Sequence, residues 1–275
     1  MNRVVVTGLG VISPVGNNVK DFWSSLAAGK CGIAPITRFD TADFKAKVAA
    51  EVKDFDPAAY EIDKTTIRRT DLYAQYALAD AHQAVEDSGI MGTVAPERLG
   101  VYVGSGIGGM QTFVNETEKI LTRGPGRVSP FFIPMMIGNI ATGNIAIRYN
   151  AQGPSLPVVT ACATSTNTIG EAFHAIRYGY ADAILAGGSE ATVNALAIGG
   201  FANCKALTEA TDPEAASLPF DRRRAGFVLG EGAAIVVLEN YDHAVARGAH
   251  IYAEMCGYGN TCDAHHITAP DPEAE

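Results

Sequence analysis

Residues 156–166 read Leu156-Pro157-Val158-Val159-Thr160-Ala161-Cys162-Ala163-Thr164-Ser165-Thr166. An apolar, β-branched run leads into one cysteine, small and hydroxylated residues follow it, and apolar residues then recur at helical spacing. The pattern predicts a strand over residues 156–160, a sharp turn at Cys162 and a helix that ends near Tyr178. At the start of a helix, backbone N–H groups and the helix dipole favour a thiolate, which is a nucleophile.

The role of Cys162 stays open on the residues alone, because free cysteines are most often small buried hydrophobic residues. A thiol nucleophile usually works with a histidine, and none of the six histidines is a convincing partner. His174 lies about three helical turns farther along the same predicted helix, which is too far for contact. We assign the other five to structural or solvated positions: His82, His243, His250, His265 and His266.

The composition indicates a globular protein without a nucleic-acid or membrane partner. The chain has 275 residues, of which 47% are hydrophobic and 19% charged, and its net charge is −9. No apolar run is long enough to span a bilayer, and the first residues predict a strand rather than a signal peptide. We therefore expect a cytoplasmic protein. The five cysteines form no C-x-x-C pair, and we expect four of them to be inert, partly buried thiols: Cys31, Cys204, Cys256 and Cys262.

Hydrophobic periodicity predicts strands alternating with helices. The predicted strands cover residues 3–7, 99–103, 156–160, 182–186, 233–238 and 251–255. The predicted helices cover residues 21–28, 71–88, pieces of 131–149, the stretch after Cys162, and a short segment from Asn240 to about Gly248. This alternation predicts an α/β fold with a mostly parallel sheet covered by helices on both faces.

Glycine-rich and charged segments favour turns over ligand sites. The Gly8-x-Gly10 motif lacks the third glycine of a dinucleotide fingerprint and predicts a tight turn. Residues 104–109 lack the lysine of a phosphate-binding P-loop, so we interpret them as a flexible turn whose Ile107 packs or lines a pocket. Residues 221–232 predict a solvated or salt-bridged turn, with anion binding as the alternative.

Six motifs are distributed along the whole chain. They are Val4-Val5-Val6-Thr7-Gly8-Leu9-Gly10, Gly104-Ser105-Gly106-Ile107-Gly108-Gly109, Gly153-Pro154-Ser155, Thr160-Ala161-Cys162-Ala163-Thr164, Ala186-Gly187-Gly188-Ser189-Glu190 and Gly226-Phe227-Val228-Leu229-Gly230-Glu231-Gly232. In this order and spacing they resemble the β-ketoacyl-acyl-carrier-protein synthases, condensing enzymes of the thiolase superfamily, and in particular the elongating type II.

The resemblance implies a thiolase-like layered α-β-α-β-α fold. Residues 1–250 would form its N-terminal βαβαβ half, and residues 251–275 the opening strand and loop of a C-terminal half. Cys162 would take an acyl chain from acyl carrier protein as a thioester. Malonyl-carrier protein would then lose carbon dioxide, and its carbanion would attack that thioester in fatty-acid elongation. The backbone N–H of Cys162 would supply half of an oxyanion hole.

The resemblance also implies roles for nine further residues and a homodimeric assembly. The acyl pocket would contain Ile107, Phe132, Ile133 and Phe201, with Phe132 and Ile133 closing the pocket of the partner subunit. The acidic carrier protein would dock on Lys64, Arg68, Arg69, Arg127 and Lys205. No cofactor and no metal are expected.

The chain departs from the family pattern in one respect. The family's two catalytic histidines lie in His-Gly-Thr and Gly-His motifs, and neither motif occurs here. We therefore expect that residues 1–275 alone do not carry out the condensation and that they expose an apolar surface. The alternatives are a polyketide-type ketosynthase and a non-catalytic fragment that only dimerises or docks carrier protein.

Overall fold

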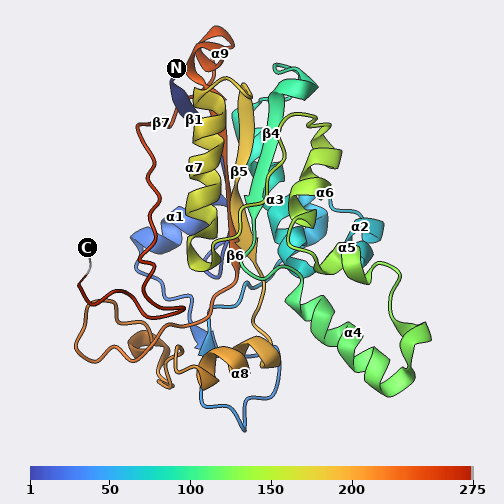
Figure 1. The fold of residues 1–275 in the computed structure, drawn as a ribbon, viewed down its shortest axis with the longest axis vertical. Helices are drawn as coiled ribbons and strands as arrows, with labels where there is room; N and C mark the ends of the chain where they lie inside the picture. The colour runs from blue at the N-terminus through green and yellow to red at the C-terminus, as the bar shows by residue number, and fades with distance from the viewer. Residues whose placement is uncertain (274–275) are drawn as a thin grey trace.

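A five-stranded sheet forms the centre of the computed structural model, which describes residues 1–273 (Figure 1). Its strands, in spatial order, are β4 (Leu99–Gly104), β5 (Ala183–Glu190), β6 (Gly232–Asn240), β1 (Val4–Ile12) and β7 (Ala253–Met255). The predicted α/β class is confirmed. The predicted mostly parallel sheet is wrong, because within the described residues only β4 and β5 are parallel and the other three pairs are antiparallel.

Helices cover both faces of this sheet, as predicted (Figure 1). On one face α3 (Leu72–Ser88) packs against β1, β5 and β6, and α6 (Ile140–Tyr149) packs against β4. On the other face lies α7 (Thr164–Arg177). Asp71 caps α3 by accepting from the N–H of Tyr73, and Gly89 ends it with a φ of +58°. These caps and the end of α7 confirm the sequence-based boundaries.

Gly8 and Gly10 lie inside β1, so the prediction of a tight turn is wrong. A Cβ atom on Gly10 would overlap the carbonyl oxygen of Asp80, and one on Gly8 would overlap that of Ala84. Both carbonyls belong to α3, whose backbone therefore approaches the strand directly. The glycines are explained by this close helix-to-strand contact rather than by a change of chain direction.

The predicted strand over residues 156–160 is absent from the part of the chain that the structure describes. The segment runs along the outer side of β4 and pairs only at its start. The N–H of Val101 donates to the carbonyl of Pro154, and the N–H of Leu156 donates back to the carbonyl of Val101. Leu156 is 43% and Val159 59% exposed, because no further strand of the described chain lies beyond this segment.

The remaining elements surround this central layer. They are α1 (Val19–Ala27), β2 (Ala34–Pro35), β3 (Val48–Ala49), η1 (Pro57–Tyr60), α2 (Lys64–Arg69), η2 (Pro96–Arg98), α4 (Met110–Arg123), η3 (Pro125–Arg127), α5 (Phe132–Met136), η4 (Ala161–Ala163), α8 (Ala195–Asn203), η5 (Pro213–Ala215) and α9 (Tyr241–Ala246). The prediction of helical pieces in residues 131–149 is confirmed by α5 and α6. No helix of the described residues combines the length and apolar character needed to cross a bilayer.

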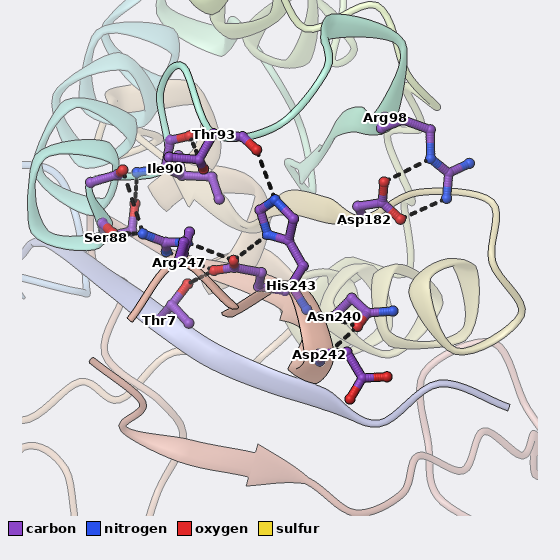
Figure 2. Close-up of polar contacts among 12 residues, drawn as sticks. Thr7, Ser88, Ile90, Thr93, Arg98, Asp182, Asn240, Asp242, His243 and Arg247 are labelled. Atoms are coloured by element: carbon purple, nitrogen blue, oxygen red, sulfur yellow. Dashed lines mark hydrogen bonds and ion pairs between the residues drawn. The ribbon is translucent and has the colours of Figure 1, made fainter. Parts of the chain in front are cut away.

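A buried ion cluster connects the strands β1 and β6 with the ends of the helices α3 and α9. Glu239, at the end of β6, is fully buried and accepts from the hydroxyl of Thr7 on β1 and twice from the guanidinium of Arg247. Arg247 also donates to the carbonyl of Ser88, the last residue of α3. Figure 2 shows the side chain of Thr7 on β1 and those of His243 and Arg247, from α9 and the residue that caps it, pointing toward one another. His243 is therefore part of this cluster and not a free surface histidine.

Candidate active site

Cys162 lies in the short turn η4, directly before the first residue of α7. Its neighbour Ala161 has a φ of +50°, a left-handed conformation that costs free energy in a non-glycine residue. The turn is braced because the N–H of Thr160 donates to Oγ1 of Thr164, and Asn167 donates to Oγ1 of Thr160. The predicted sharp turn and following helix are confirmed, and the sulfur-bearing side chain is exposed.

Cys162 lines a cavity of about 490 Å³ formed by the ends of β4, β5 and β6 and by the turn. Of the predicted pocket residues, Ile107 and Phe201 line this cavity. Phe132 and Ile133 lie on α5, outside its lining. Phe227, to which the sequence assigned no role, also lines the cavity and packs edge-on against Phe201 with ring centroids 5.3 Å apart.

Two carboxyl groups also line the cavity, that of the buried Glu231 and that of the partly buried Glu190, and no sequence signal beyond their place in the motifs indicates a role for either one. Burial raises the pKa of Glu190 to about 7, against the opposing effect of hydrogen bonds from Ser105 and Gly106. Burial likewise raises the pKa of Glu231, although the Arg38 guanidinium lies 2.7 Å from its carboxylate. The cavity therefore combines an apolar wall with weakly acidic carboxyl groups.

The predicted docking residues are exposed but lie in three places. Lys64, Arg68 and Arg69 belong to α2, and the guanidinium of Arg69 lies 4.7 Å from the ring centre of Phe131. Arg127 ends η3, and Lys205 follows α8, the helix that carries Phe201.

A second cleft, of about 400 Å³, lies beside α2 and α4. Arg68 lines it together with Lys119 and Arg123. Lys119 is paired with Glu116. In the charged segment 221–232, Arg223 pairs with Asp221 at 2.8 Å, which confirms the salt-bridged turn.

All five cysteines are exposed, so the prediction that four are partly buried is wrong. The four besides Cys162 lie outside the helices and strands, where little packs over them: Cys31, Cys204, Cys256 and Cys262. Exposure therefore does not distinguish Cys162, whereas its place at a helix start beside a cavity does. Among residues 1–273 no group of three or more His, Cys, Asp or Glu side chains is arranged to hold a metal ion.

Comparison with known proteins places these motifs in one family. The model of the β-ketoacyl synthase N-terminal domain matches residues 1–244. The chain is 53% identical to the 3-oxoacyl-[acyl-carrier-protein] synthase 2 of Coxiella burnetii and 49% identical to that of Staphylococcus aureus strain COL. Each comparison covers 99% of this chain and 66% of the relative, so the chain spans slightly less than two thirds of these relatives.

Solved structures agree with this assignment and confirm the predicted thiolase-like fold. The ishigamide ketosynthase/chain length factor has a TM-score of 0.88 at 36% identity, covering 99% of this chain and 67% of that one. A β-ketoacyl synthase from Burkholderia phymatum has a TM-score of 0.89 at 30% identity, covering 98% and 66%. A type II polyketide ketosynthase bound to its acyl-carrier protein has a TM-score of 0.84 at 33% identity, covering 97% and 65%.

Proposed function

Because the chain belongs to the β-ketoacyl synthase family, we propose that residues 1–275 carry the acyl-accepting cysteine of a 3-oxoacyl-[acyl-carrier-protein] synthase of fatty-acid elongation, whose condensation step also needs the two catalytic histidines that this chain lacks. One observation carries the proposal: an exposed cysteine at the start of α7 lines a cavity of about 490 Å³. A cavity of this size suits an apolar chain attached through a thioester. The enzyme is an acyltransferase with a cysteine nucleophile.

The reaction has two steps, both at the sulfur of Cys162. First, the thiol attacks the acyl thioester of the carrier protein, the acyl group moves to Cys162, and the phosphopantetheine thiol leaves with the proton. Second, malonyl-carrier protein loses carbon dioxide, and its carbanion attacks the Cys162 thioester. The product is a 3-oxoacyl-carrier protein two carbons longer, and the thiolate of Cys162 is released. The backbone N–H of Cys162 stabilises the oxyanion in each step.

The partner is acyl carrier protein, an acidic protein. The exposed cationic groups of Lys64, Arg68, Arg69, Arg127 and Lys205 support this assignment, since opposite charge accelerates encounter even for a protein with a net charge of −9. A polyketide ketosynthase of similar structure has been solved in complex with its acyl-carrier protein, which supports the same kind of partner here.

We assign a homodimer in which residues 156–160 pair with the same segment of a second copy. The exposed side chains of Leu156 and Val159, together with the unpaired outer side of this segment in the described chain, support that edge-to-edge contact. Phe132 and Ile133 would then help to close the cavity of the partner. Sedimentation analysis of Val159→Asp tests this assembly: a monomeric variant of a dimeric parent supports it, and an unchanged mass contradicts it.

Five free cysteines support the proposal of a cytoplasmic protein, since free thiols are usual in a reducing compartment. Polyketide synthesis is the second candidate, since one of the similar structures is a type II polyketide ketosynthase. The higher identity to the 3-oxoacyl-[acyl-carrier-protein] synthases, 53% and 49% against 33%, favours fatty-acid elongation.

Labelling with cerulenin, a cysteine-directed inhibitor of condensing enzymes, tests whether Cys162 is a competent nucleophile. Peptide mass mapping is expected to find the adduct on Cys162 and to find little on Cys204, which is also exposed. The variant Cys162→Ala is expected to lose the adduct, and Cys204→Ala to keep it. Equal labelling of all exposed cysteines, or none on Cys162, would favour a fragment that only binds or dimerises.

A further inference from the structure

The carboxylate of Glu190 holds the loop that carries Ile107. Its two oxygens accept from the hydroxyl of Ser105 at 3.2 Å and from the N–H of Gly106 at 2.9 Å. The hydroxyl oxygen of Ser105 in turn accepts from the N–H of Gly108 at 2.8 Å. The backbone on both sides of Ile107 is therefore fixed, directly or through Ser105, by one side chain at the end of β5.

The opposite side of the same loop is fixed by α5. The N–H of Gly109 donates to the carbonyl of Met136 at 2.9 Å, and a Cβ atom on Gly109 would overlap the carbonyl oxygen of Met135. On the cavity side, a Cβ atom on Gly106 would lie 2.8 Å from the carboxylate of Glu190. The loop thus fits closely between Glu190 and α5. Gly106 and Gly109 allow these close contacts because they have no Cβ atom.

Each oxygen of Glu190 accepts a hydrogen bond from one of these loop donors, so the side chain holds the loop at two points. The second acid of the cavity, Glu231, makes its contacts elsewhere, with Arg38 and the N–H of Val52. Of these two acids, only Glu190 bonds to the segment that contains Ile107. Ile107 itself is 41% exposed and lines the cavity beside Cys162.

We propose that Glu190 is a positioning residue that sets acyl-chain selectivity by fixing the place of Ile107 in the cavity next to Cys162. This inference rests on the proposed function, because it assumes that the cavity receives the acyl chain. A shift of Ile107 changes the length of chain that fits, and each methylene gained or lost in an apolar pocket changes the rate of transfer.

The test compares Glu190→Ala with Glu190→Gln. The glutamine carbonyl can still accept from Gly106, and its amide can donate to the hydroxyl oxygen of Ser105, so the loop is retained. The measured quantity is the rate of acyl transfer to Cys162 from hexanoyl-, dodecanoyl- and hexadecanoyl-carrier protein. Alkylation of Cys162 by iodoacetamide, which needs no acyl cavity, reports thiol reactivity in each variant.

Glu190→Ala is expected to change the ratio of long-chain to short-chain transfer by on the order of tenfold, with little change in iodoacetamide alkylation. Glu190→Gln is expected to keep the ratio of the parent, and Gly106 and Gly108 amides should exchange faster only in Glu190→Ala. The inference is overturned if the ratio of long-chain to short-chain transfer is unchanged in Glu190→Ala, or if it changes equally in Glu190→Gln. In either case, acyl transfer to Cys162 in the parent still supports the proposed function. If the parent accepts none of the three acyl chains, the proposed function fails and the inference fails with it.

Discussion

Nδ1 of His243 lies 2.6 Å from Oε1 of the fully buried Glu239, and Nε2 of the same ring lies 2.8 Å from the carbonyl oxygen of Thr93 (Figure 2). A carboxylate and a carbonyl are both acceptors, so both ring nitrogens must donate and the imidazole is protonated. Burial alone would lower the pKa of His243, but the bonds to Thr93 and Glu239 outweigh it and raise the pKa above its usual value.

The substitution His243→Gln is expected to destabilise the protein most at mildly acidic pH. A histidine whose pKa is raised on folding stabilises the fold below its unfolded pKa and loses that contribution as pH rises through the folded pKa. The expected loss is about 1–2 kcal/mol near pH 6 and smaller near pH 9. Urea unfolding at the two pH values measures it, and an equal loss at both would contradict a protonated His243.

The charged groups around His243 determine how far the pH can fall before the cluster stops stabilising the fold. On its own helix segment it faces Arg247, on β6 it faces Glu239, and the Arg98–Asp182 pair lies nearby. Burial would raise the pKa of Glu239, but hydrogen bonds from Arg247, Thr7 and His243 bring it below its usual value. The contribution of Glu239 is therefore present above its unfolded pKa and lost as pH falls, so the cluster stabilises most between about pH 5 and 6.5.

Removal of the negative charge at Glu239 is expected to cost far more than the same change at the surface. Glu239→Gln leaves the guanidinium of Arg247, only 13% exposed, without a carboxylate, and the expected loss is about 3 kcal/mol. Glu254→Gln is the matched control, because Glu254 also makes two bonds to one arginine, Arg3, but at the exposed edge of the sheet. Similar unfolding midpoints for the two variants would contradict the structural importance of the buried cluster.

Asp80→Ala is expected to stabilise the protein. Asp80 is fully buried in α3, and within residues 1–273 neither carboxyl oxygen has a hydrogen-bond partner. Burial raises its pKa well above the usual value, so the folded state keeps a proton that the unfolded chain releases. Stability therefore falls as pH rises above about 4, and the gain from the substitution is about 1–3 kcal/mol at neutral pH and smaller near pH 4.

The control for Asp80→Ala is Glu86→Ala, on the exposed side of the same helix. Both substitutions stabilise the helix through the higher helix propensity of alanine, but only Asp80→Ala removes a buried carboxyl group. Denaturant unfolding of both variants at two pH values separates the effects. A destabilised Asp80→Ala would show that the carboxyl group has a partner in solution.

The effect of Gly170→Ala on stability is expected to have opposite signs in the parent and in a Tyr258→Ala variant. Gly170 in α7 lies so close to the ring of Tyr258 that a Cβ atom would overlap it. In the parent the substitution should destabilise by displacing this ring. In a Tyr258→Ala background only the helix propensity remains, and the same substitution should stabilise by about 0.5–1 kcal/mol. A double-mutant cycle by thermal unfolding measures the coupling, and equal effects in both backgrounds would contradict the contact.

Local patterns in the sequence predicted the elements whose structure depends on neighbouring residues. The caps of α3 at Asp71 and Gly89 and the turn at Cys162 belong to this class. Residues 156–160 have the composition of a strand but lack a neighbour on their outer side, so composition alone misassigned them.

Local sequence patterns could not predict the contacts between segments that are far apart in the sequence. The antiparallel direction of β6 has no signal in its own residues, and the role of Gly10 follows from a helix 70 residues away at Asp80. Glu190 carries no local signal for bonding to Gly106, because 84 residues separate them. The motif resemblance supplied the cavity residue Ile107, whereas the contacts that hold it required the fold.

Acyl transfer to Cys162 is the most direct test of the proposed function. The protein is incubated with dodecanoyl-carrier protein, digested and mapped by mass spectrometry, with Cys162→Ala as control. The expected result is one acyl thioester, on Cys162, that hydroxylamine removes and that is missing from the variant. An acyl group spread over all five exposed cysteines, or absent from Cys162, would contradict it.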